Sequence, residues 1–198
     1  NGVPQLSPDD LSPLLDLLVE RGGELGIGLV TDRANRQLLR LALEAEPRRP
    51  EPPDNRGNPF RVASATSAYR TAARRHDAAQ ATRNTERQAR TVRYLREAGA
   101  LLGRTADAGR TDLFGAIARG DVFLGEPGCG VRYLVLISDG KDNVRRSPVG
   151  TSPAVANLVL VGAAMPSLLD TYRPSRFEGI GAAFRWIVSR ERTKGSEH

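Results

Sequence analysis

The chain has 198 residues, of which 39% are hydrophobic and 26% charged, a size and balance typical of one globular domain with an ordinary core. Its single cysteine excludes an internal disulfide, and no apolar run approaches the roughly eighteen residues that a membrane-spanning helix needs. The net charge of +6 is concentrated, because residues 61–104 hold 10 arginines against three acidic residues and leave −1 for the rest of the chain.

The first elements follow from local patterns. Ser7 is a suitable N-cap, Pro8 suits the first helical position, and two aspartates follow, so we predict that a helix begins here and continues to Gly22. The apolar run over residues 25–31 predicts a strand. Residues 36–43 form a second strand or a short helix, and the strand is favoured.

Two unusual segments come next. Five prolines within residues 44–60 predict an exposed loop without regular structure. Residues 61–104 are rich in Ala, Arg and Gln, which predicts helix, with His76 exposed among charges. The middle of this segment is polar on nearly all sides, and one helix of about 55 Å would overhang a domain of this size. It therefore either breaks near Asn84, or projects into solvent or onto a partner.

The second half of the chain alternates helices with apolar runs. A short helix is predicted over residues 113–118, capped by Thr111 or Asp112, with a loop over residues 121–130. The runs at residues 134–137 and 155–161 predict strands that are buried on both faces, as in parallel sheets. An amphipathic helix is predicted to close the chain over residues 177–189. This alternation predicts an α/β sandwich.

Three stretches resemble the von Willebrand factor A (vWA) domain family in its bacterial form. Residues 110–117 (RTDLFGAI) are similar to the family's threonine loop and the helix after it. Residues 134–140 (LVLISDG) resemble its fourth strand, and residues 158–162 (LVLVG) resemble the next strand. The resemblance implies an α/β fold with a doubly wound, mostly parallel sheet flanked by helices.

The resemblance also implies a domain organisation. Residues 1–198 would form a single vWA-like domain. The Pro-rich loop at residues 44–60 and the basic, Arg-rich helical segment at residues 61–104 would be a long insertion within it.

The family's metal-ion-dependent adhesion site implies Thr111 and Asp139 as ligands of Mg²⁺, which prefers hydroxyl, carboxylate and water oxygens. The family's third ligand motif, Asp-x-Ser-x-Ser after its first strand, does not occur in the sequence. Two explanations are open. The chain as given begins just after that motif, with the other ligands upstream of Asn1, or the motif is lost and another segment supplies the central strand.

The function expected from these features is a non-catalytic protein–protein interaction module for adhesion or scaffolding, dependent on Mg²⁺ through an incomplete site. An enzyme is not expected, because the sequence holds no nucleophile elbow, phosphate loop or His/Cys cluster. The alternative is binding of nucleic acid or another anionic partner by the basic helix. The residues expected to contact a partner are Asp112, Asp142, Asn143, Arg83, Arg87 and Arg90.

Overall fold

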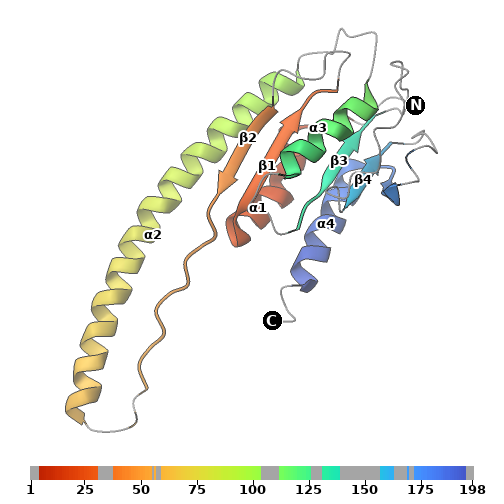
Figure 1. Cartoon of the computed structure of the whole chain (residues 1–198). Helices are drawn as coiled ribbons and strands as arrows, with labels where there is room; N and C mark the ends of the chain where they lie inside the picture. Colours follow the sequence, from red (N-terminus) through yellow and green to blue (C-terminus); the bar gives the residue numbers. More distant parts are fainter. Residues whose placement is uncertain are drawn as a thin grey trace.

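The structure is a computed structural model of the whole chain, and it combines a small α/β core with one very long helix (Figure 1). The residues that it describes are 5–30, 38–54, 56, 59–103, 112–125, 131–138, 157–162, 169 and 172–194.

The N-terminal elements form as predicted. A 3₁₀ turn, η1 (Pro8–Leu11), leads into α1 (Ser12–Arg21). Ser7 caps the turn, because its backbone N–H donates to Asp10 Oδ2 at 2.8 Å and its hydroxyl accepts from the Asp10 backbone N–H at 3.4 Å. Gly22 ends α1 with a φ of 73°, and an added Cβ there would lie 2.5 Å from the Ala45 backbone nitrogen. Only glycine fits this turn.

The next two strands form an antiparallel pair. β1 (Gly23–Gly28) begins two residues before the predicted strand, and β2 (Leu38–Leu43) confirms the strand that was favoured over a helix. Ile27 lies opposite Leu39, and Gly23 lies opposite Leu43.

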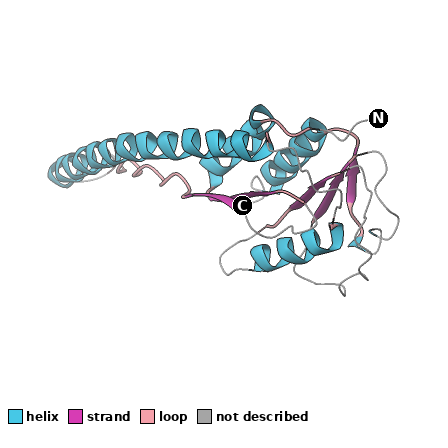
Figure 2. Cartoon of the chain, turned by 90° about the horizontal axis from the view of Figure 1, so that it is seen from above, coloured by secondary structure: helices cyan, strands magenta, loops and turns pink. Residues whose placement is uncertain are grey.

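α2 (Pro59–Leu102) is one continuous helix of 44 residues, roughly 66 Å long, so no break occurs near Asn84. Only its C-terminal part enters the core, where Tyr94 and Leu101 are buried. The remainder projects from the domain, and the Pro-rich segment runs back along it (Figures 1 and 2). We call residues 44–56 and 59–90 the arm.

The C-terminal half contains α3 (Leu113–Gly125), β3 (Leu134–Ile137), β4 (Leu158–Val161), β5 (Ser175–Phe177) and α4 (Ile180–Lys194). β3, β4 and β5 form a parallel sheet in that order. Both apolar runs are therefore strands, as predicted. α3 extends beyond its predicted end, so the loop expected over residues 121–130 begins later, and β5 was not predicted.

The predicted doubly wound, mostly parallel sheet is wrong. Within the described residues the strands form two separate sheets, one antiparallel pair and one parallel sheet of three strands. The physical reason is that apolar patterns identify strands but do not determine which strand edges pair. No backbone pairing joins β1 to β3 in the described part of the chain, and helices contribute most of the regular structure.

The two sheets nevertheless share one hydrophobic core. Its buried side chains come from η1, α1, both strands of the pair, the end of α2, β4 and α4: Leu11, Leu15, Leu18, Ile27, Leu41, Leu43, Tyr94, Ala98, Leu101, Val159, Val161, Ile180, Ala183, Phe184 and Ile187. A smaller cluster joins α3 to β3 and β4. No helix in the described ranges is long and apolar enough to cross a membrane.

Candidate functional site

One edge of the parallel sheet gathers the ends of β3 and the beginning of α3 (Figure 1). α3 runs antiparallel to β3. Gly120 packs against Leu134 at the start of the strand, with only 2.6 Å between an added Cβ and Leu134 Cδ1. Ile117, one turn earlier in α3, belongs to the same hydrophobic cluster as Leu136. The first residues of α3 therefore lie toward the carboxyl end of β3. We call this region the carboxyl edge.

The carboxyl edge holds the two buried polar side chains of the described residues. Asp112, directly before α3, is 2% exposed, and Ser138, directly after β3, is 6% exposed. Buried polar groups are costly unless they are hydrogen-bonded, so their placement at one edge gives this part of the core a polar end.

Asp112 caps α3. Its Oδ1 accepts from the Gly115 backbone N–H at 2.7 Å, and its carbonyl accepts from the Ala116 N–H at 3.0 Å. The sequence left the cap open between Thr111 and Asp112, and the structure assigns it to Asp112. The contact is close, since an added Cβ at Gly115 would lie 2.1 Å from Asp112 Oδ2.

The remaining predicted residues of this edge are not placed. Thr111, Asp139, Asp142 and Asn143 lie outside the described residues. Ser138, the chain neighbour of Asp139, donates its backbone N–H to the Val161 carbonyl at 3.2 Å. Within the described ranges, no group of three or more His, Cys, Asp and Glu side chains could hold a metal ion.

The arm is the second candidate surface, and arginines join its two halves. Arg90 donates to the Ala42 carbonyl at 2.6 Å, and Arg87 donates to the Glu44 carbonyl at 3.3 Å. Two of the three arginines expected to contact a partner thus bind backbone carbonyls of the chain itself. Arg83, the third, is exposed.

Further out, polar side chains continue the same contact. His76 Nε2 lies 3.1 Å from the Pro47 carbonyl, so His76 is half-buried and the prediction of an exposed histidine is wrong. The Gln80 side-chain amide donates to Glu46. Arg49 pairs with Asp77 at 3.0 Å, an exposed ion pair that contributes little stability.

The two halves of the arm pack with matching periods. A covered stripe repeats every seven residues along α2: Thr66, Ala73, Gln80, Arg87, Tyr94 and Leu101. Opposite it, Pro47, Pro50 and Pro53 are half-buried at intervals of three, the period of a polyproline II helix. These two repeats are visible in the sequence and would have revealed the packing, but the polar character of the stripe hid it.

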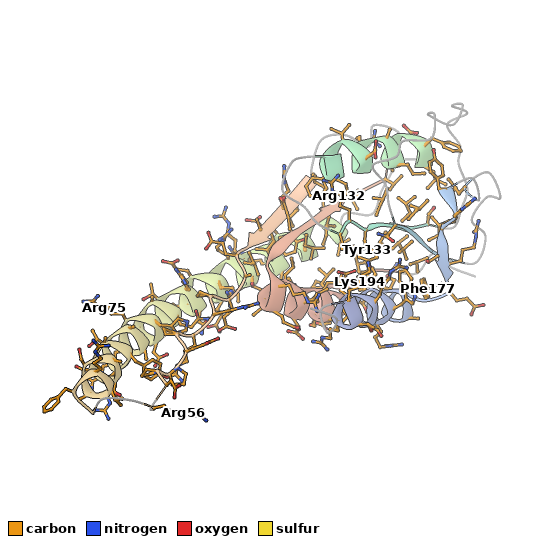
Figure 3. The ribbon with its side chains drawn as sticks, turned by 60° about the horizontal axis from the view of Figure 1, so that its bottom comes forward. Arg56, Arg75, Arg132, Tyr133, Phe177 and Lys194 are labelled. Atoms are coloured by element: carbon orange, nitrogen blue, oxygen red, sulfur yellow. The ribbon has the colours of Figure 1, made fainter. Side chains whose placement is uncertain are left out.

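The outer face of the arm carries exposed arginines. They are Arg70, Arg74, Arg75 and Arg83. Within the described residues none of these four forms an ion pair, and Figure 3 shows Arg75 projecting away from the Pro-rich segment. Arg70 and Arg74 are one helical turn apart, where like charges repel.

Comparison of the chain with protein-family models, with curated proteins and with solved structures finds no match. The resemblance of three stretches to vWA domains therefore remains a prediction. Function is inferred from the carboxyl edge and the arm.

Proposed function

We propose that the chain is a non-catalytic module that binds an acidic surface of a protein partner through the outer face of the arm. The observation that supports this function is the group of exposed arginines on a helix that extends far beyond the core (Figure 2). An arginine guanidinium can donate two parallel hydrogen bonds to one carboxylate, which makes arginine well suited to an acidic protein surface.

The energetics of the arm support a binding role. Like charges at positions i and i+4 destabilise a helix by about 0.2–0.5 kcal/mol per pair, and Arg70–Arg74 and Arg83–Arg87 are such pairs. The arm contains little apolar contact of its own to offset this repulsion; Ala73 is its buried hydrophobic residue within the described ranges. Carboxylates of a partner would replace the repulsion by attraction.

The charge pattern favours an acidic protein over nucleic acid. The arm carries 10 arginines but also six acidic residues, so its net charge is only +4. A phosphate backbone would meet these acidic groups along the whole arm, whereas a protein surface can match a mixed pattern. Aromatic groups for base stacking are also few, since Tyr69 is half-buried and only Phe60, 86% exposed, is open.

The test compares two variants with the same change of charge. Arg74→Gln/Arg75→Gln alters the arm, and Arg185→Gln/Arg190→Gln alters exposed positions of α4. Fluorescence anisotropy with a Glu-rich peptide and with a 20-base-pair DNA duplex serves as readout. The arm variant should weaken peptide binding about tenfold, as expected for two lost ion pairs, and the α4 variant less than about twofold. Equal losses would show that only net charge matters, and tighter binding of the duplex would favour nucleic acid.

A second candidate function is Mg²⁺-assisted adhesion at the carboxyl edge. It is favoured by the burial of Asp112 and Ser138 at the same edge, because Thr111 and Asp139 are their direct chain neighbours. Hydroxyl and carboxylate oxygens suit Mg²⁺. Isothermal titration of the chain with MgCl₂ tests it. Thr111→Ala and Asp139→Ala should each abolish the binding heat and Asp9→Ala should not, whereas no heat from the unmodified chain would exclude this candidate.

A further inference from the structure

Two strands of the core are paired on one side only. Among the described residues, β1 pairs with β2 alone, and β3 pairs with β4 alone. Figure 1 shows that β1 and β3 point toward the same end of the domain. Each therefore presents an edge of unsatisfied backbone groups, which proteins normally cover or protect.

Both edges lie in one layer between the same helices. On one face, Phe123 of α3 packs on Gly26 of β1, where an added Cβ would be 3.1 Å from the ring, while Gly120 of α3 packs on Leu134 of β3. On the other face, side chains of α1 and α4 form one cluster with Ile27 of β1 and Val159 of β4. The two sheets are therefore halves of a single layer.

The separation of the halves matches one missing strand. Gly120 and Phe123 lie within one turn of α3 yet contact different sheets, so one helix width spans the distance from β3 to β1. A helix with its side chains is about 10 Å wide, and neighbouring strands lie about 4.8 Å apart. Two strand spacings therefore separate β1 from β3.

The hydrogen bonds of β3 define which groups face this space. The Leu134 N–H donates to the Asn157 carbonyl at 3.1 Å, and the Ser138 N–H donates to the Val161 carbonyl at 3.2 Å. Backbone groups alternate in direction along a parallel strand, so the N–H and C=O of Val135 and Ile137 point away from β4. Both side chains are half-buried, and no proline or lysine guards the edge.

We propose that an extended apolar strand of a partner chain inserts between β1 and β3, parallel to both, and joins the two sheets into one. Its side chains would alternate between α3 and the α1/α4 layer, so both of its faces must be apolar. β4 shows what such an interior strand looks like here, since all four residues of its Leu-Val-Leu-Val run are buried. The partner is therefore recognised as a short, continuous apolar segment.

Amide hydrogen exchange on the complete chain tests the proposal, with a lysine-flanked peptide copying residues 157–162 (NLVLVG) as the probe. In the free chain the amides of Val135 and Ile137 should exchange fast and those of Leu136 and Ser138 slowly. The peptide should slow Val135 and Ile137 at least tenfold and raise the melting temperature by roughly 5–10 °C at a hundredfold excess over Kd.

A control peptide with alternate residues N-methylated lacks the donors for one edge and should give neither effect. Four results would overturn the proposal. Val135 and Ile137 amides as protected as Leu136 in the free chain would show that the edge is already paired. Protection that rises with protein concentration alone would show that a second copy fills the space. Equal effects of the two peptides would exclude backbone pairing, and no binding of the unmodified peptide would exclude an apolar strand.

Discussion

The closest contact at the scale of single residues is that between Asp112 and Gly115 at the start of α3. An alanine Cβ at Gly115 would lie 2.1 Å from the Asp112 carboxylate. Although alanine favours helix over glycine by up to about 1 kcal/mol, we expect Gly115→Ala to lower the free energy of unfolding by about 1–3 kcal/mol, because the carboxylate must leave its capping position. Urea denaturation measures this change.

A double-mutant cycle separates this clash from other effects. Asp112→Ala removes the cap and should cost about 1 kcal/mol. In that background Gly115→Ala meets no carboxylate, so it should be neutral or stabilising. If the two costs simply add, the residues do not interact as the structure indicates.

Two buried tyrosines make stability depend on alkaline pH. Burial raises the pKa of Tyr133, and so does the hydrogen bond that its hydroxyl donates to Glu191 at 2.6 Å. Burial alone raises the pKa of Tyr94. Each folded pKa lies above the unfolded value of about 10, so the unfolded chain loses these protons first. Stability should therefore be complete below about pH 10 and fall above it.

Unfolding free energies between about pH 8 and pH 11 check this prediction. Tyr133→Phe cannot ionise, and its stability should fall less steeply with pH than that of the unmodified chain. An unchanged slope in Tyr133→Phe would show that this hydroxyl does not contribute to the pH dependence.

At the scale of elements, local patterns predicted what local chemistry determines. The capped start at Ser7, the strands at residues 134–137 and 158–161, and the helix of the Arg-rich segment all follow from nearest neighbours. β5 was missed because it is only three residues long and has Arg176 at its centre, so it lacks an apolar run. His76 was placed wrongly because its partner, the Pro47 carbonyl, is distant in sequence.

The contact between α2 and the end of β2 gives a prediction for one element pair. Arg90 holds the Ala42 carbonyl at 2.6 Å. We expect Arg90→Ala to lower the free energy of unfolding by about 1 kcal/mol and to speed proteolysis of residues 44–56. Arg83→Ala, an exposed position on the same helix, serves as control and should change stability by less than about 0.5 kcal/mol. Similar losses in both variants would indicate a general effect of charge on the helix.

At the scale of the whole molecule, the predicted sheet failed where pairing between distant segments decides the architecture. β1 and β3 were each predicted as strands, yet no sequence pattern specifies the edge that each one leaves unpaired. The candidate site divides in the same way. The cap at Asp112 was foreseen from its neighbours, whereas the roles of Arg87 and Arg90 depend on carbonyls more than forty residues away. The part of the molecule that can be removed is likewise set by these distant contacts.

The core and the arm should be separable. The core cluster uses α2 only from Tyr94 onward, and Glu46 contacts Gln80 where the arm could be shortened. Joining Pro47 to Gln80 through a short Gly-Ser linker deletes residues 48–79 and removes Arg70, Arg74 and Arg75. Because a shorter loop costs little to close, we expect cooperative unfolding with a free energy within about 1 kcal/mol of the parent.

The same deletion should weaken binding of the Glu-rich peptide by about tenfold or more, because the exposed arginines are gone. Chemical denaturation and peptide anisotropy on one preparation measure both properties. Loss of cooperative unfolding would show that the arm stabilises the core. A folded deletion variant that binds the peptide as tightly as the parent would move the binding surface from the arm to the rest of the domain.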